Sequence, residues 1–281
     1  VMAAARAHAG DVEVARAACG ALQYLACVAD NQAPLVRDGA HSAVMAAVQA
    51  HGGDLEVARG ACCALRNLSF GADNRVSLVR DGAHGAVMAA ARAHAGDVEV
   101  AQHACFALWS MVIAADNLVP LVRDGVHAAV MAALRAHAGD MEVAGAAYGT
   151  LINLVVAADD CVPLVRDGAH IAVMAVAQAY SGQVEMVRTL CATLAKLAGT
   201  TDDTVQLVRD GVHTAVMAAA RTHSDDVEAV RAACSTLANL LQAVECRAEL
   251  VRDGVREFVT FVSGLHTGDA KVQDLCRGVA L

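Results

Sequence analysis

The pattern of apolar and polar positions repeats along the chain every 43 residues. A fixed period of this size indicates a solenoid or a propeller. A propeller would need four strands per repeat, and no alternating apolar and polar strand pattern accompanies the period, so stacked helices are predicted. The heptapeptide LVRDGAH and its near copies mark the register, beginning at Leu35, Leu78, Leu121, Leu164, Leu207 and Leu250.

Turn residues divide each repeat into three predicted helices. In residues 35–77, Gly39 would end a short first helix in the left-handed conformation, and a second helix runs from His41 to His51. Asp54 would then cap a third helix, whose apolar residues recur every three or four positions. Other aspartates precede the first helices and are expected to cap them, namely Asp30, Asp73, Asp116, Asp159 and Asp202.

The segment LVRDGAHSAVMAAV…GDLEVARGACCALRNLS resembles the armadillo repeat. The likeness lies in the corner that ends in glycine, the amphipathic second helix and a third helix ending Ala-Leu-x-Asn-Leu, and it extends over all repeats. This resemblance implies an all-α fold, a right-handed superhelical α-solenoid of three-helix repeats. It also implies a concave groove, lined by the third helices, that binds extended peptides or partner proteins.

We expect a single armadillo-repeat array over residues 1–281. Because the array begins inside a repeat without an initiator methionine, and solenoids need polar terminal caps, we expect a fragment of a longer protein or part of a larger complex. The last segment departs from the pattern and is either a cap or a drifted repeat. The expected units are a partial unit 1–34, full units 35–77, 78–120, 121–163, 164–206 and 207–249, and a partial or capping unit 250–281.

Charge and cysteine usage narrow the class of protein. The net charge of −9 argues against a nucleic-acid partner and leaves room for a basic peptide. Charged residues interrupt every apolar stretch, so no membrane insertion is expected. Equivalent cysteines of stacked repeats would lie about 8–10 Å apart, too far for disulfides, which indicates reduced, buried thiols in an intracellular, cytoplasmic protein. These cysteines are Cys19, Cys62, Cys105, Cys191 and Cys234.

Repeated charged residues have structural explanations that compete with chemistry. The Arg-Asp pair of each corner suits the end of a helix and its turn, and six active sites without a nucleophile are not expected. One histidine column ends the second helices (His51 and its equivalents) and suits the helix dipole. The other column (His41 and its equivalents) begins them. The spacing provides no converging ligands, so we expect no metal, no cofactor and no enzyme, while pH sensing stays open.

Glutamates recur in the first turn of the third helices, and arginines follow three residues later, as in Glu13 and Arg16. One interpretation is a solvated helix face held by pairs of about 0.2–0.5 kcal/mol each. The other is an acidic margin of the groove that favours a basic ligand.

Variable columns of the repeat are where a particular partner would be recognised. The resemblance places a backbone-holding asparagine in one column, which here contains Tyr24, Asn67, Ser110, Asn153, Lys196 and Asn239. The tryptophan that nuclear-import receptors carry four residues earlier is missing from every repeat, so classical nuclear-localisation peptides are not expected as ligands.

The column just before the asparagine contains Arg66 and Trp109 and is expected to face solvent, because a buried arginine without partners is costly. Trp109 is a candidate anchor together with Phe106, three residues earlier. The alternative is that Trp109 folds back onto a neighbouring repeat.

Together these patterns predict a non-catalytic protein-interaction scaffold that binds an extended segment of a partner protein in the groove. Asparagine amides would hold the segment's backbone, and Tyr24, Arg66, Phe106 and Trp109 would recognise its side chains. The alternative is a structural subunit of a cytoskeletal, axonemal or membrane-associated assembly, held by its ends and outer face.

Overall fold

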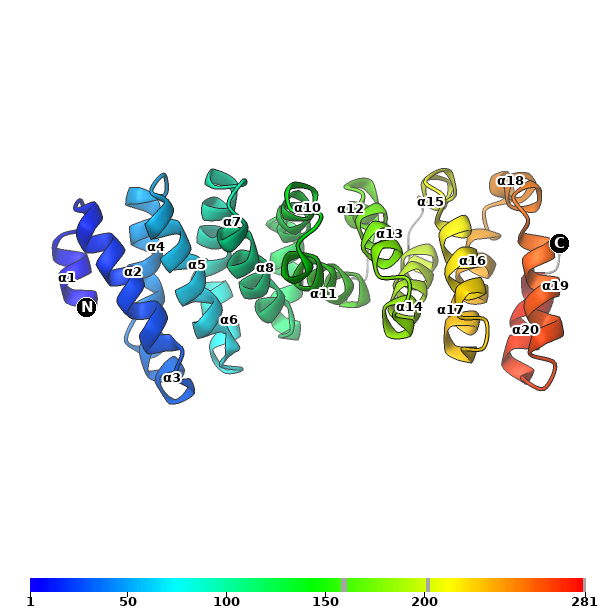
Figure 1. Ribbon diagram of the computed structural model, residues 1–281, viewed down its shortest axis with the longest axis horizontal. Coiled ribbons are helices and arrows are strands. Elements are labelled where there is room, and N and C mark those ends of the chain that lie inside the picture. The colour runs from blue at the N-terminus through cyan, green and yellow to red at the C-terminus, as the bar shows by residue number, and fades with distance from the viewer. Residues whose placement is uncertain (158–160, 201–202, 280–281) are drawn as a thin grey trace. The chain divides into compact units, whose positions relative to one another are not determined.

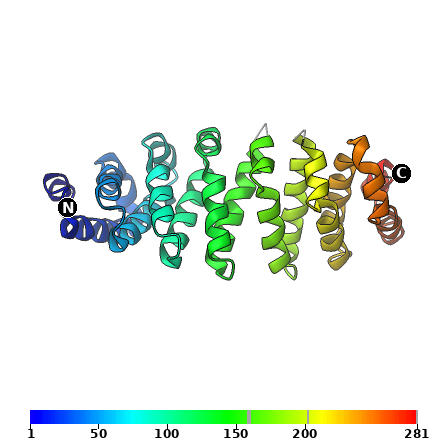
Figure 2. The same cartoon turned by 90° about the horizontal axis from the view of Figure 1, so that it is seen from above.

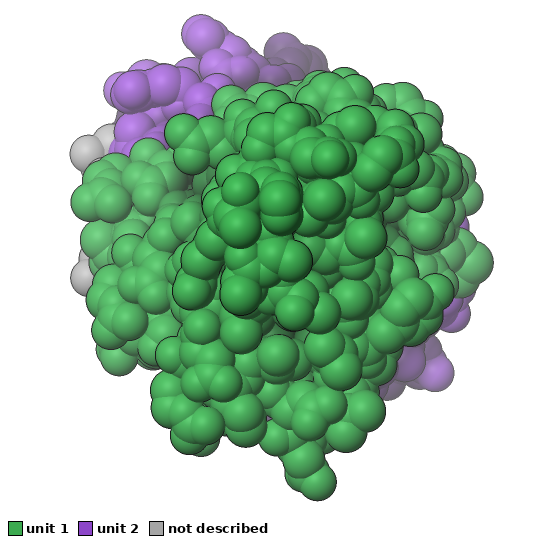
Figure 3. Space-filling view, turned by 90° about the vertical axis from the view of Figure 1, so that its left-hand side faces the viewer, with its two compact units in different colours: residues 1–157 green, residues 158–281 purple. Residues whose placement is uncertain are grey.

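The computed structural model describes residues 1–157, 161–200 and 203–279, and all regular structure in these ranges is helical. The contacts divide the chain into two compact units, Val1–Ala157 (unit 1) and Ala158–Leu281 (unit 2), coloured separately in Figure 3. Within each unit, three-helix repeats follow one another in chain order (Figures 1 and 2). The predicted all-α solenoid of 43-residue, three-helix repeats is confirmed.

The first helices are short and end at the Arg-Asp-Gly corner. Each corner glycine has a positive φ, between 79° and 88°, which only glycine adopts at little cost. The expected role of Gly39 and its equivalents is confirmed. The first helices are α3 (Ala29–Arg37), α6 (Asn74–Arg80), α9 (Leu118–Arg123), α12 (Val162–Arg166), α15 (Thr204–Arg209) and α18 (Arg247–Arg252).

The aspartates predicted to cap the first helices do not do so in the described ranges. Asp73 occupies the N-cap position of α6 without a side-chain bond to the backbone, Asp30 lies inside α3, and Asp116 lies in the 3-10 helix η1 (Ala115–Asn117). Asp159 and Asp202 lie outside the described residues.

Asparagine side chains occupy these junctions instead. The buried Asn74 amide donates to the Leu68 carbonyl at 2.9 Å, and the buried Asn117 amide donates to the Met111 carbonyl at 2.9 Å. The first helix follows the third so closely that an amide is needed to satisfy carbonyls left over at the end of the third helix.

From α4 onward the second helices begin directly after the corner glycine, and the third helices begin after an aspartate except α14, which begins after Gln183. Asp54 accepts a hydrogen bond from the Val57 N–H at 3.1 Å, and Asp97 accepts one from the Val100 N–H at 2.9 Å, so the predicted caps of the third helices are confirmed. The second helices are α1 (Met2–Ala7), α4 (Ala40–His51), α7 (Ala83–Ala93), α10 (Val126–Ala136), α13 (Ala169–Ala179), α16 (Val212–Thr222) and α19 (Val255–Leu265). The third helices are α2 (Val12–Ala26), α5 (Leu55–Phe70), α8 (Val98–Val112), α11 (Met141–Ala157), α14 (Val184–Thr200), α17 (Val227–Leu240) and α20 (Ala270–Val279).

The core of each unit lies between the third helices and the helices that cover them. Successive third helices pack against one another, α2 on α5 and α5 on α8 in unit 1, and α14 on α17 in unit 2. The five cysteines in equivalent positions are free and buried there, as predicted. Burial raises the pKa of Cys62, Cys105 and Cys191 to about 12, so these thiols are protonated and act as small apolar groups.

Two histidine columns link successive repeats. At the end of five second helices a histidine donates from Nε2 to a backbone carbonyl of the preceding repeat, as from His51 to Ala9 at 2.8 Å and from His223 to Ser181 at 2.7 Å. Tyr180 takes this place in α13. From the sequence, this column was explained by the favourable interaction of histidine with the helix dipole. The structure adds a carbonyl oxygen that accepts a hydrogen bond from the imidazole.

The second column consists of buried histidines at the start of the second helices. His41 Nε2 lies 3.0 Å from Asp81 Oδ2 of the next corner, and His213 Nε2 lies 3.1 Å from Asp253 Oδ2. The corner aspartate was expected to bond within its own turn. Asp81 does accept from Arg80 Nε at 3.0 Å, and it is also the acceptor for the preceding repeat. These two donors, Arg80 first, lower the pKa of Asp81.

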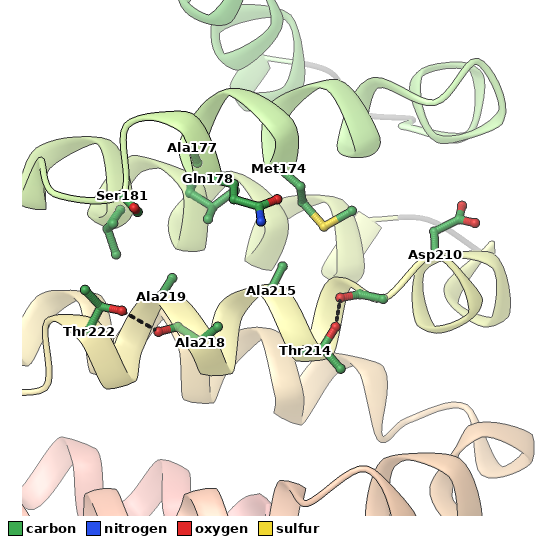
Figure 4. A pocket seen from close by; sticks show the side chains of 13 residues that line it. Met174, Ala177, Gln178, Ser181, Asp210, Thr214, Ala215, Ala218, Ala219 and Thr222 are labelled. Atoms are coloured by element: carbon green, nitrogen blue, oxygen red, sulfur yellow. Dashed lines mark hydrogen bonds between the residues drawn. The ribbon is translucent and has the colours of Figure 1, made fainter.

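The second-helix layer contains hollows between successive helices. Three of them have volumes of about 40 Å³ between α1 and α4, about 120 Å³ between α7 and α10, and about 580 Å³ between α13 and α16. Figure 4 shows the large hollow, where Met174 and Gln178 of α13 face Ala215 and Ala219 of α16. The alanine-rich facing sides leave this space open.

Within the described ranges, no single helix combines the length and the apolar character needed to cross a membrane. One bent pair, Val98–Val112 with Ala115–Arg123, meets both criteria together, with a bend of 111° between its parts.

Candidate partner-binding surface on the third helices

The predicted groove residues lie on the third helices, toward their C-terminal ends. In unit 1 they bring together an aromatic surface, defined here as Arg66, Phe70, Phe106 and Trp109 of α5 and α8. Tyr24 lies on α2 with 73% of its surface exposed. Asn153 lies on α11, whereas Lys196 and Asn239 lie in unit 2 on α14 and α17.

Arg66 is at the centre of the aromatic surface. Its guanidinium carbon lies 4.7 Å from the Phe106 ring centroid and 5.6 Å from the Phe70 ring centroid. Each such cation–π contact contributes about 0.5–1 kcal/mol at an exposed site. Its Nη1 donates to His103 Nδ1 at 3.3 Å, and burial together with the nearby guanidinium lowers the pKa of His103. The column was expected to face solvent, but Arg66 and Trp109 are half-buried, because the aromatic rings flank the guanidinium.

The Trp109 indole contacts both the next repeat and the Phe106 ring of its own helix. The two ring centroids are 6.0 Å apart with an interplanar angle of 67°, an edge-to-face pair. A Cβ atom added to Gly149 of α11 would meet the indole Nε1 at 2.6 Å, so the indole rests directly on the backbone of the next repeat. The indole thus folds onto a neighbour, as the alternative hypothesis proposed, while its half-buried state leaves part of it on the surface.

The polar residues of the predicted asparagine column bond within the protein. The Asn67 amide donates to the Gln23 carbonyl at 3.0 Å, and the Asn239 amide donates to the Ala195 carbonyl at 3.0 Å, so both link successive third helices. The Asn153 amide donates to its own helix, to Gly149 at 2.9 Å. The buried Ser110 hydroxyl donates to the Ser69 carbonyl at 2.6 Å. These bonds give the column a structural use, and its role toward a ligand stays a prediction.

Two members of this site were missed in the sequence. Phe70 lies one helical turn after Arg66, and His103 lies on the helix next to it. A signal for Phe70 existed in the sequence, since residues four apart meet on one helix face. His103 had none, because its contact with Arg66 crosses between repeats.

An ion-pair ladder runs across the N-terminal halves of the third helices. Arg16 pairs with Glu13 at 2.6 Å, as the spacing predicted, and also with the cap Asp54 of the next repeat at 2.5 Å. Arg59 repeats the link to Asp97 at 2.6 Å. A polar hollow of about 220 Å³ lies within this ladder, lined by Arg16, Gly20, Gln23, Glu56, Arg59, Gly60 and Glu99.

The ladder loses its arginine at two consecutive repeats of unit 1. Gln102 stands in the arginine column of α8 and bonds to Asp140 at 3.0 Å, and Gly145 stands there in α11 with open space around it. Glu142 and Asp140 therefore form an acidic gap with no arginine from this column beside it, next to the aromatic surface.

Within the described part of the chain, no group of three or more His, Cys, Asp or Glu side chains is placed to hold a metal ion. The aromatic surface and the acidic gap bring together arginine, aromatic and acidic side chains of the third helices.

Comparison with solved structures gives the same architecture. One similar chain comes from work on a phosphorylation switch that controls the interaction between cadherin and beta-catenin. It superposes with a TM-score of 0.62 at 17% sequence identity, covering 99% of this chain and 62% of that chain. This likeness shows the fold, and the chain spans about three fifths of that neighbour.

Comparison at the level of sequence assigns the family. No curated protein matches the chain. The family model described as LRRK2 ARM repeat matches residues 1–159, more than half of the chain and all of unit 1. With the three-helix repeat and its armadillo-like corner already in the structure, this match shows that the chain belongs to the LRRK2 ARM repeat family.

Proposed function

We propose that unit 1 is a non-catalytic binding module that holds an extended segment of a partner protein across its third helices. The observation that carries this proposal is the aromatic surface, where Arg66, Phe106 and Trp109 stand together, half-buried. Aromatic residues and arginine dominate the binding energy of protein interfaces, and rigid groups lose little entropy when a partner docks.

The acidic gap supports a preference for a basic residue in the partner. Arg59 occupies the corresponding place two repeats before Gly145 and pairs with a glutamate and with a cap aspartate. At Gly145 that place is open, so a lysine or arginine of the partner would complete the ladder with Glu142. Opposite charge raises the rate of encounter and penalises the wrong partners.

We further place the protein inside the cell, in the cytoplasm, as a scaffold within a larger complex. Its free cysteines support this placement, since reduced thiols are typical of intracellular compartments.

Site-specific photo-crosslinking in cells tests the proposal. A photoreactive phenylalanine analogue at Phe70, which is 42% exposed, is compared with the same analogue at Ile171 of α13, which is 50% exposed. We expect a partner adduct at Phe70 that disappears when Gly145→Arg restores the missing arginine. A Cβ atom added at Gly145 meets no other atom within 4 Å, so the backbone there has room for a side chain, and circular dichroism checks that the variant is folded.

Adducts at Ile171 alone would contradict the proposal. They would instead support the structural-subunit hypothesis, in which the outer face is held by the assembly. An adduct at Phe70 that persists in Gly145→Arg would refute the basic residue but leave the aromatic surface as the binding site.

A further inference from the structure

The ten cysteines divide sharply by accessibility. Eight are buried, whereas Cys27 is exposed and Cys63 is half-buried. All ten lie in described residues. Buried thiols with raised pKa values are protected from oxidants, because the thiolate is the reactive form and must be reached from solvent. Any reversible thiol chemistry therefore concentrates on Cys27 and Cys63.

These two accessible thiols belong to successive repeats, and both lie near the side-chain nitrogen of Asn67. Asn67 Nδ2 lies 3.2 Å from Cys27 Sγ and 3.8 Å from Cys63 Sγ, so the two sulfur atoms are at most 7.0 Å apart. Cys27 follows the last residue of α2, in the short turn before α3, outside both helices. Its thiol donates to the Gln23 carbonyl at 3.2 Å, a weak bond that is easily given up.

Cys63 is partly reachable from solvent and lies beside the Arg66 guanidinium. Burial raises the pKa of Cys63, and this guanidinium opposes the effect only in part, so the geometry of the pair carries the argument. A disulfide needs sulfurs about 2.05 Å apart and Cα atoms about 4.4–6.8 Å apart, so rotation of both side chains and a small shift of the turn at Cys27 are required.

We propose that Cys27 and Cys63 are a modification site that forms a reversible disulfide with hydrogen peroxide as the oxidant. The Cys27 thiolate attacks one peroxide oxygen, the S–O bond forms, the O–O bond breaks and hydroxide leaves, giving a sulfenic acid. The Cys63 thiolate then attacks this sulfur, the S–S bond forms, the S–O bond breaks and the oxygen leaves as water after protonation. Two thiols lose two electrons, and one peroxide becomes two waters.

The disulfide would tie the end of α2 to α5 one turn before Arg66. It also removes both sulfurs from the Asn67 amide, at the edge of the aromatic surface. This chemistry depends only on the pair of thiols, so it stands or falls independently of the proposed binding function.

Intact-mass measurement of the whole chain tests the site. The reduced protein is treated with hydrogen peroxide in the presence of dimedone, which traps sulfenic acids, and free thiols are then blocked. We expect the wild type to lose two hydrogens, to show a Cys27–Cys63 link in non-reducing peptide maps, and to regain its mass with dithiothreitol. Cys63→Ser should lose the link and carry dimedone on Cys27.

Cys62→Ser is the matched control, since Cys62 is adjacent in sequence and fully buried. It should form the link as the wild type does, and circular dichroism checks that each variant is folded. A wild type that carries dimedone on Cys27 as heavily as Cys63→Ser does would overturn the proposal. So would a link that joins two molecules or uses Cys62. If Cys63→Ser does not fold, Cys63→Ala takes its place.

Discussion

The third helices of the two units share one skeleton but present different side chains. In the column of Arg66 and Trp109, unit 2 carries Ala195 and Ala238. In the column of Phe70, where unit 1 also carries the exposed Ile113 and Val156, unit 2 carries Gly199 and Gln242. On α5, α8 and α11, unit 1 thus presents large side chains where unit 2 presents small or polar ones, whereas α2 carries Gln23 and Cys27 in these columns.

The skeleton beneath these columns is the same in both units. Arg16 of unit 1 and Arg188 of unit 2 each bond to their own glutamate and to the cap aspartate of the next repeat. This ladder uses a column other than those of Arg66 and Phe70, so the side chains of the latter two columns can differ between the units while the ladder is kept. We therefore assign the binding hypothesis to unit 1.

The largest expected effect is a loss of binding affinity that occurs on changing the third helices of unit 1 but not those of unit 2. Arg66→Ala should weaken binding of the partner crosslinked at Phe70 by about 30-fold, because an interface hot spot is worth about 2 kcal/mol or more. Gln242→Ala, at the position of unit 2 that is equivalent to Phe70, is the control and should leave the affinity unchanged. Titration calorimetry measures both, and equal losses would remove the distinction between the units.

The next effect concerns how Trp109 is held. Gly149→Ala pushes a Cβ into the indole, which overpacking arguments put at about 1–3 kcal/mol of lost stability. Gly145→Ala, four residues earlier on the same helix, enters open space and should stabilise the helix by up to about 1 kcal/mol. Urea unfolding gives both values, and fluorescence of the single tryptophan should change only in Gly149→Ala.

The fold was predictable because its signals are local and repeated. The positive-φ glycine, the cap aspartate of the third helix and the apolar spacing each act within a few residues, and all three were found where the sequence placed them. The site was only partly predictable. Arg66, Phe106 and Trp109 were identified, but the stacking of Arg66 on Phe106 and the seat of Trp109 on Gly149 depend on contacts between repeats, which no local pattern records.

The same limit explains the errors at the junctions. Asp30 and Asp73 look like caps by residue type, yet the end of the preceding helix leaves carbonyls that need a donor. An aspartate cannot donate, and Asn74 can. The requirement arises from the meeting of two helices and is invisible in either helix alone.

A smaller effect should be shared by both units, since it belongs to the skeleton. The hydrogen bond from Arg16, and then that from the Val57 N–H, lower the pKa of Asp54 from 3.8 to about 2. A lowered folded-state pKa stabilises the protein above the unfolded value, and the gain disappears as pH falls through the folded value.

Asp54→Asn should therefore be less stable than the wild type near neutral pH and approach it between about pH 4 and pH 2. Asp226→Asn in unit 2 should behave alike, because Arg188 lowers the pKa of Asp226 in the same way. Asparagine is also a good cap, so the substitution isolates the charge. Thermal unfolding followed at several pH values measures the difference, and a pH-independent gap would contradict the assignment.

The smallest effect addresses the hollow between α13 and α16 in unit 2. Ala219→Val adds two carbons to its wall, and the equivalent positions already carry Val176 and Val262. The gain from burial, about 0.8 kcal/mol per CH₂ when complete, exceeds the helix penalty of valine, so we expect about 0.5 kcal/mol of added stability. Ala93→Val, at the end of α7, is the control outside this hollow. A loss of stability in Ala219→Val would contradict the prediction that the hollow accepts a larger side chain.

The links between successive repeats have a consequence for how such a chain changes in length. The histidines of the two columns and the arginines of the ladder reach forward or backward to a partner about one period away, as in His51 with Ala9 and Arg59 with Asp97. Each repeat thus supplies one partner of the links to the repeat before it and one partner of the links to the repeat after it. Excising one whole period inside a unit rejoins matching halves, whereas a cut one residue longer or shorter separates all of them at once. Insertions or deletions of one whole period therefore keep these links, whereas those of other lengths break them.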